Sequence, residues 1–219
     1  MKMLAEPQSG SLQGETHAHN RYGQYVRSRS TPVNPNSTAQ GAVRARLSVN
    51  AAAWRAITEN QRAGWESLGS QMTRTDALGQ SYALNGFGAY VSVNNNLAAA
   101  GVALIDDAPA LVTPEGLSTA VITTTAGTLS VAYTATPLPT GTKLLTYASP
   151  QRSPGRAFEG DLRLIAVSAA AAASPANVLS AYSARFGAPV VGNKIFFAFH
   201  TTIGGFRSGP LSTSVIVTA

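Results

Sequence analysis

The stretch 194-KIFFAFHTT-202 decides the fold of the C-terminal half of this chain. Its apolar positions Ile195, Phe197 and Phe199 are two residues apart, which places them on one face of a β-strand. Seven short strands at this spacing predict a small antiparallel β-sandwich over residues 118–219. The other six β-branched or aromatic runs, separated by Gly, Pro, Asn or Asp, are TAVITTT (119–125), TLSVAYTA (128–135), KLLTYAS (143–149), LRLIAVS (162–168), VLSAYSARFG (178–187) and STSVIVTA (212–219).

Residues 37–101, toward the N-terminus, have the spacing of helices. Ser37 or Thr38 is suited to cap the first helix, and Thr58 with Gln61 forms a capping-box pattern at the start of the second. A third helix ends at Gly101. The apolar residues expected to form the helical faces, including both tryptophans in one small core, are Val43, Leu47, Ala51, Trp54, Ile57, Trp65, Leu68, Met72, Leu84, Phe87, Tyr90, Val91 and Leu97.

Two further segments complete the predicted organisation. Residues 1–36 form an extended arm, in which the sequence around Asn20–Gly23 is suited to a tight turn between two strands. Residues 102–117 form a proline-containing linker. We therefore expect an α+β chain in two parts: an arm or β-hairpin with a helical region at 37–101, and an all-β sandwich at 118–219.

Composition limits the classes of protein. The chain has 219 residues, of which 44% are hydrophobic and only 12% are charged, with a net charge of +6. Such hydrophobicity is typical of a folded chain, and the sparse surface charge suits association with other copies. The absence of cysteine excludes disulfides and thiolate chemistry. We expect no signal peptide and no membrane span, because no apolar run is long enough.

The strongest local signal is 19-HNRYGQYVRSRSTPVNPNSTAQ-40, which combines aromatic residues and arginines with no acid. Six arginines and no Asp or Glu lie between Thr16 and Thr58. Three interpretations compete: contacts with neighbouring subunits, contacts with nucleic-acid phosphates, and a solvated surface. We favour subunit contacts, because a two-stranded ribbon is only marginally stable alone. The candidate interaction residues are Arg21, Tyr22, Tyr25, Arg27, Arg29, Arg44 and Arg46.

No group of residues predicts catalysis. His17, His19 and Glu15 share one strand face, but two polar histidines on an exposed ribbon explain them better than a metal site. The acidic pairs Asp106–Asp107 and Glu159/Asp161 are expected in a solvated turn and an exposed loop, and IGGFRSG (203–209) in a hairpin. No nucleophile or phosphate-loop motif is present. We expect no enzymatic activity, no catalytic residues, no cofactor and no metal.

The N-terminal motif resembles a family of uncharacterised phage and prophage proteins, with the pattern GSxxGxTxxxNRxGxYVRxRxxPVNPNTxAQxxVR followed by W…LTxxQRxxW. The C-terminal part resembles immunoglobulin or fibronectin III-like modules in architecture. The family resemblance implies a virion-associated structural role and transfers no functional residue. The matching residues are Gly10, Ser11, Gly14, Thr16, Asn20, Arg21, Gly23, Tyr25, Val26, Arg27, Arg29, Pro32 to Asn36, Ala39, Gln40, Val43, Arg44, Trp54, Thr58, Gln61, Arg62 and Trp65.

Together these features predict a non-enzymatic structural protein of a phage-like particle: a capsid decoration or minor head protein, or a tail or fibre component. Its partners would be other virion proteins and copies of itself, it would be made in the host cytoplasm and located in the virion, and no membrane would be involved. One alternative is a nucleic-acid-binding particle protein that uses the same arginines. Another is a surface carbohydrate-binding or adhesive module that uses the sandwich loops.

Overall fold

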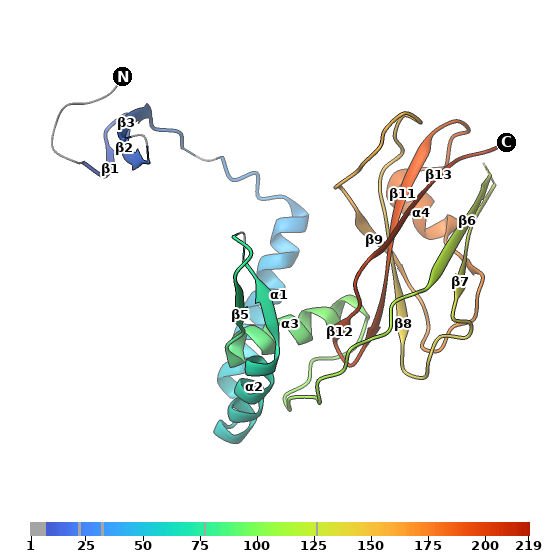
Figure 1. The fold of residues 1–219 in the computed structure, drawn as a ribbon, viewed down its shortest axis with the longest axis horizontal. Helices are drawn as coiled ribbons and strands as arrows, with labels where there is room; N and C mark the ends of the chain where they lie inside the picture. Colours follow the sequence, from blue (N-terminus) through green and yellow to red (C-terminus); the bar gives the residue numbers. More distant parts are fainter. Residues whose placement is uncertain (1–7, 22, 32, 77, 126) are drawn as a thin grey trace. The chain divides into compact units, whose positions relative to one another are not determined.

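The structure is a computed structural model that describes residues 8–219 except 22, 32, 77 and 126. Within these residues the chain is mixed α+β, with four helices and several antiparallel sheets (Figure 1). The α+β class predicted from the sequence is therefore confirmed. The chain separates into two compact units, Met1–Val43 and Arg44–Ala219.

The first unit is a three-stranded antiparallel sheet. Strands β1 (Gly10–Leu12), β2 (Glu15–Asn20) and β3 (Gly23–Ser28) lie in that order. The predicted turn is confirmed by the Asn20–Gly23 pair, whereas β1 was not predicted. None of the described residues of this unit is buried. The sheet thus has no hydrophobic core of its own.

The second unit begins with three helices: α1 (Thr38–Ala56, whose first turns belong to the first unit), α2 (Glu59–Gln71) and α3 (Gly86–Ala99). The predicted caps are present, since Ser37 Oγ accepts from the Gln40 amide and Thr58 with Gln61 forms a capping box. The unpredicted hairpin of β4 (Thr73–Thr75) and β5 (Ser81–Ala83) separates α2 from α3.

The helices enclose a small core around Tyr90. The predicted clustering of the tryptophans is confirmed, because the rings of Trp54 and Trp65 lie 5.4 and 5.1 Å from that of Tyr90. The face predicted on α1 is only half right. Ile57, directly after α1, is 7% exposed, but Leu47 within α1 is 49% exposed, so the first part of this helix adds little to the core.

Two antiparallel sheets form most of the rest of the unit. One contains β10 (Ala176–Asn177), β7 (Thr128–Thr134) and β6 (Thr119–Thr125), in that order. The central strand of the other sheet is β11 (Lys194–Ile203). It pairs on one side with β8 (Lys143–Ala148), which in turn pairs with β9 (Arg163–Val167). On its other side it pairs with β12 (Phe206–Arg207) and β13 (Leu211–Ile216). Both sheets contribute to one core, which contains Leu129, Val131, Leu144, Ile195, Phe197 and Phe199.

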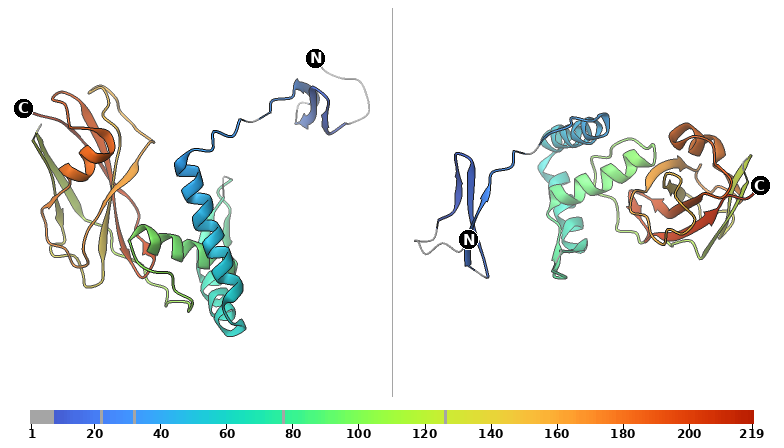
Figure 2. Two further views of the ribbon diagram at one scale, coloured as in Figure 1. Left: turned by 180° about the vertical axis from the view of Figure 1, so that it is seen from behind. Right: turned by 90° about the horizontal axis from the view of Figure 1, so that it is seen from above.

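One predicted strand is wrong. Residues 178–187 form helix α4 (Leu179–Phe186), which lies beside the sheets in both views of Figure 2. Val178, Tyr182 and Phe186 are four residues apart, so as a helix they all face the core. Gly187 ends the helix with φ of 87°, a conformation that favours glycine. The four-residue spacing of these apolar side chains and the terminal glycine therefore favour a helix over the predicted strand.

The β11–β12 turn joins the sheets to the helices. Phe206 is buried in the helical core, and the Asn96 amide donates to the Gly205 carbonyl at 2.8 Å. A Cβ at Gly205 would lie 2.5 Å from Val93 Cγ1, and its φ is 83°. Only glycine fits this approach. The hairpin predicted at 203–209 is confirmed, and its tip is a packing element.

We predict that Gly205→Ala lowers the free energy of unfolding by about 3 kcal/mol, because the added methyl group overlaps α3 and the backbone is left-handed. Gly204→Ala is the matched control: its φ is 57°, but a Cβ there would meet no atom closer than 4.0 Å. Gly204→Ala should lower the free energy of unfolding by only about 1 kcal/mol. Urea unfolding of both variants measures the difference, and equal losses would contradict this account of the contact.

Candidate functional site

The predicted interaction residues of the first unit are distributed over its sheet. Tyr25 and Arg27 lie on one face of β3, paired with Ala18 and Thr16, and Tyr25 is 36% exposed. Arg21 lies in the β2–β3 turn and Arg29 directly follows β3; both are exposed. Tyr22 lies outside the described residues. Tyr25 and Arg27 are therefore the pair that the register brings together.

The remaining two predicted residues, Arg44 and Arg46, lie on α1 and are exposed. They are two residues apart in a helix, so their side chains leave it in different directions. Arg46 lines a small apolar hollow of about 210 Å³ between α1 and α3. The positions of these two arginines on α1 therefore do not place them in a single binding site.

The acidic residues considered in the sequence have structural contacts. The Asp107 carboxylate accepts from the Gln61 amide at 2.9 Å, and the Asp161 carboxylate pairs with Arg163 through two bonds of 3.0 Å. Glu159 was expected in an exposed loop, but it is 6% exposed and accepts from the Asp161 amide and from Arg152. The Asp161 amide, followed by Arg152, holds the pKa of Glu159 below its usual value despite burial.

Metal-ligating side chains do not gather in the described ranges. No three His, Asp or Glu side chains come close enough there to hold an ion. His17 and His19 lie on the same face of β2, as alternation predicted. Neither of them belongs to such a group, and the structure offers no further ligand for them among its described residues.

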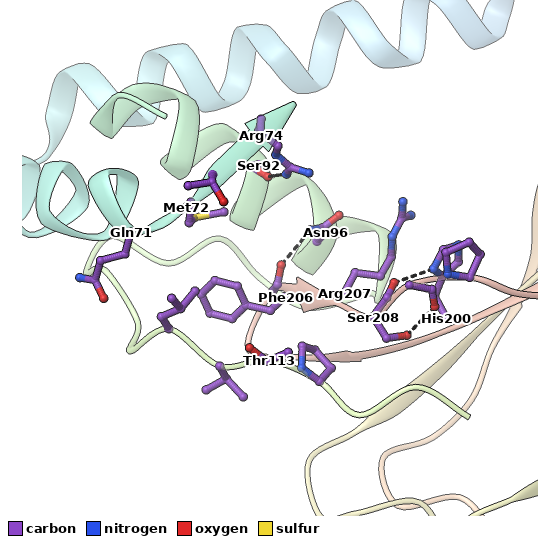
Figure 3. Close-up of a pocket in the computed structure, with 17 residues that line it drawn as sticks. Gln71, Met72, Arg74, Ser92, Asn96, Thr113, His200, Phe206, Arg207 and Ser208 are labelled. Carbon is purple, nitrogen blue, oxygen red and sulfur yellow. Dashed lines mark hydrogen bonds between the residues drawn. The ribbon is translucent and has the colours of Figure 1, made fainter. Parts of the chain in front are cut away.

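A groove of about 560 Å³ lies between the helices and the sheets (Figure 3). Its helical side is formed by the end of α2, by β4 and by α3, and its other side by β12 and by residues 111–114. Figure 3 shows the labelled side chains around Phe206 and Asn96. The contact that buries Phe206 therefore also shapes the groove.

A cation lies on the helical side of the groove. Arg74 on β4 donates from Nη2 to Ser92 Oγ on α3 at 2.9 Å. This bond fixes one end of the guanidinium and leaves its other N–H groups available, because Arg74 makes no ion pair in the described chain. Arg74 is exposed, so ligand access does not require a change in the fold.

A second cation, Arg207 on β12, lies on the sheet side. Its Nη1 donates to the Tyr147 hydroxyl at 3.1 Å, and its guanidinium lies 5.8 Å from the centre of that ring. His200 meets the same ring edge-on and is joined to the Ser208 carbonyl by Nδ1 at 2.9 Å. Since a carbonyl only accepts, Nδ1 carries the proton.

The groove is positively charged. Burial lowers the pKa of His200 below 6.5, the hydrogen bond to Ser208 opposes this, and the charge of Arg207 adds to the lowering. His200 is therefore neutral at pH 7, and the charge comes from Arg74 and Arg207. None of the described residues that line the groove is an Asp or a Glu. Such a lining favours anionic ligands.

Sequence reasoning did not identify this groove. Arg74, Ser92 and Arg207 are far apart in the chain. The hydrogen bond between Arg74 and Ser92 joins β4 to α3, and the β11–β12 turn brings Arg207 to the same groove. The one local signal was the Gly204–Gly205 pair directly before Phe206 and Arg207, which marked a tight turn that carries an aromatic residue and a cation.

Comparison with known proteins leaves the family open. No protein-family model matches the chain, and none of the curated proteins compared has a significant similarity to it. No helix in the described ranges combines the length and the apolar character that crossing a membrane requires. The resemblance to phage and prophage proteins therefore stays a prediction.

We predict that His200 makes stability depend on pH. Because the pKa of His200 is lower in the folded chain, the unfolded chain takes up the proton first as the pH falls. The stability that neutral His200 contributes is fully present above pH 6.5. It is lost as the pH falls through the pKa of His200 in the folded chain. Urea unfolding of the wild type should therefore show a loss of stability as the pH falls below 6.5, and His200→Asn should reduce this loss.

The comparison of the wild type with His200→Asn is specific to His200, because both proteins contain His17 and His19. The lowered pKa values of Glu159 and Asp161 affect stability only below about 4.5. Asn retains an N–H that can donate to the Ser208 carbonyl. If both proteins lose stability equally across this range, His200 is not the titrating group.

Proposed function

We propose that this chain is a non-enzymatic structural protein of a phage-like particle, as a capsid decoration, minor head, tail or fibre component. Residues 1–36 and the helices anchor it, and the sheets, as a fibronectin III-like sandwich, are displayed. The observation that carries this proposal is the first unit: three strands without a buried residue among those described.

A sheet without a core gains little from its own fold. Its hydrogen bonds offset a modest part of the entropy lost on ordering, and burial of apolar surface normally supplies the rest. Leu12 on β1 is largely exposed, and Val26 on β3 is only half-buried. A partner surface would cover these residues and supply the missing burial.

The sheet edges are the natural points of contact. Within the described first unit, β1 and β3 each have one neighbour and therefore one unpaired edge. An unpaired edge extends a neighbouring sheet by main-chain hydrogen bonds. Tyr25 and Arg27, exposed on one face, supply side-chain contacts of the kind enriched at protein interfaces.

We expect deletion of residues 1–36 to abolish assembly, measured as self-association in sedimentation or as incorporation into particles. The truncated chain keeps Ser37 as the cap of α1, so its helices and sheets should unfold at an unchanged temperature. Thermal unfolding followed by circular dichroism provides that control.

Hydrogen exchange of the isolated full-length chain gives the decisive complement. The proposal requires fast exchange at β1–β3 until a partner is bound. A monodisperse monomer whose β1–β3 amides are strongly protected would contradict it, as would a truncated chain that still assembles.

Nucleic-acid binding is a second candidate, favoured by one observation. Arg27 and Arg29 are exposed and make no ion pair in the described part of the chain, so both charges are available to phosphates. The same face carries Tyr25, whose aromatic ring is of the kind on which bases stack.

This candidate predicts duplex DNA binding that weakens steeply with salt. Arg27→Ala with Arg29→Ala should reduce the slope of log affinity against log salt by about two, one for each phosphate that is no longer neutralised. Arg185→Ala, an exposed arginine on α4, is the control and should leave the slope unchanged. Absent binding, or a slope unaffected by the double substitution, excludes the candidate.

A further inference from the structure

The groove around Phe206 has fixed walls. The Asn96 amide holds the Gly205 carbonyl, and the Lys143 ammonium donates to the Ala100 carbonyl at 2.8 Å, so two bonds join the sheets to α3 and its end. The Thr201 hydroxyl donates to the Glu115 carbonyl and fixes the far end of the segment that forms the other wall. A site with fixed walls loses little entropy when a ligand binds.

That wall has unused main-chain groups. Residues 108–117 form neither helix, strand nor turn, and the N–H and C=O groups of Leu111, Val112 and Thr113 make no hydrogen bond in the described chain. Leu111 and Val112 are 45% and 41% exposed. A segment with free donors, free acceptors and exposed apolar side chains is suited to pair with another strand.

The charges specify the partner further. Arg74 and Arg207 belong to the same groove, neither makes an ion pair in the described chain, and the lining contains no acid. Carboxylates are the side chains that guanidinium groups bind through paired, charge-assisted hydrogen bonds. A basic ligand would meet uncompensated repulsion here.

The lining favours a peptide over a glycan. Among the described residues that line the groove, Phe206 is the only aromatic side chain besides the His200 imidazole, and its ring is buried in the helical core. This lining therefore lacks an exposed aromatic platform for a sugar ring. It offers instead unpaired backbone beside apolar side chains, including Met72, which a strand with alternating apolar and acidic residues complements.

We propose that this groove binds an extended acidic peptide segment of a partner protein. The main chain of Leu111–Thr113 pairs with the peptide, Arg74 and Arg207 bind its carboxylates, and its apolar side chains contact Met72, Leu111 and Val112. This site is independent of the N-terminal sheet, so it adds a second mode of interaction to the proposed function.

The test is fluorescence anisotropy with the full-length chain and a labelled peptide of about six residues that alternates Glu and Val, which spans ~20 Å as a strand. We expect saturable binding that weakens with salt. Arg74→Ala with Arg207→Ala should weaken it by about tenfold or more, and Arg185→Ala should leave it unchanged. Both groove arginines are exposed, so the fold should tolerate their removal.

A second variant tests the main-chain contact. Val112→Pro removes one N–H without changing the charge, and it should weaken the same peptide while the unfolding midpoint stays the same. Three outcomes would each overturn the proposal. The double arginine variant binds the peptide as tightly as the wild type, a peptide with Lys in place of Glu binds equally well, or the acidic peptide does not bind. Preferential binding of an oligogalacturonate would overturn it in favour of an acidic glycan.

Because the test does not involve assembly, its outcome is separate from that of the proposed function. The chain without residues 1–36 should bind the peptide as the full-length chain does, even where it no longer assembles. A truncated chain that neither assembles nor binds the peptide would place the binding site in the N-terminal sheet and overturn the assignment to the groove.

Discussion

The main-chain approach of Gly205 to helix α3 governs the second unit of this protein. No other residue type fits a site where a Cβ would meet Val93 at 2.5 Å, and the absence of a side chain lets the β11–β12 turn enter the helical core. Phe206 is buried as a result, and Arg207 follows it into the groove that Arg74 lines from the other side. The groove is thus a consequence of one close contact between a turn and a helix.

Local patterns predicted the elements whose residues interact within a few positions. The capping box of Thr58 and Gln61 and the tight turn at Asn20–Gly23 are read from short stretches, and six of the seven predicted strands were found. Helix α4 was missed because its apolar residues fit both periodicities, and the contact of Tyr182 with the shared core decided between them. The β4–β5 hairpin was missed because its strands are only three residues long.

The linker predicted at 102–117 shows why the groove was beyond sequence reasoning. Its first part is bound to the helices by side chains that the pattern gave no reason to pair: Asn94 bonds both backbone groups of Ile105, and the Trp65 indole donates to the Asp106 carbonyl. Its middle part, Leu111–Thr113, then lacks hydrogen bonds in the described chain. Tertiary contacts decide which backbone groups of this segment are hydrogen-bonded and which are not, and these contacts cannot be predicted from the composition of the segment.

The two candidate interaction surfaces differ in the entropy that binding costs. The N-terminal sheet has no buried residue among those described, so a partner must offset the ordering of its strands as well as the loss of free motion. The groove is already held by Asn96 and Lys143, so its cost falls mainly on the ligand. The sheet is therefore suited to extensive contacts within an assembly, where many subunits supply surface. The groove is suited to a short segment, for which two guanidinium groups and a few main-chain bonds supply enough affinity.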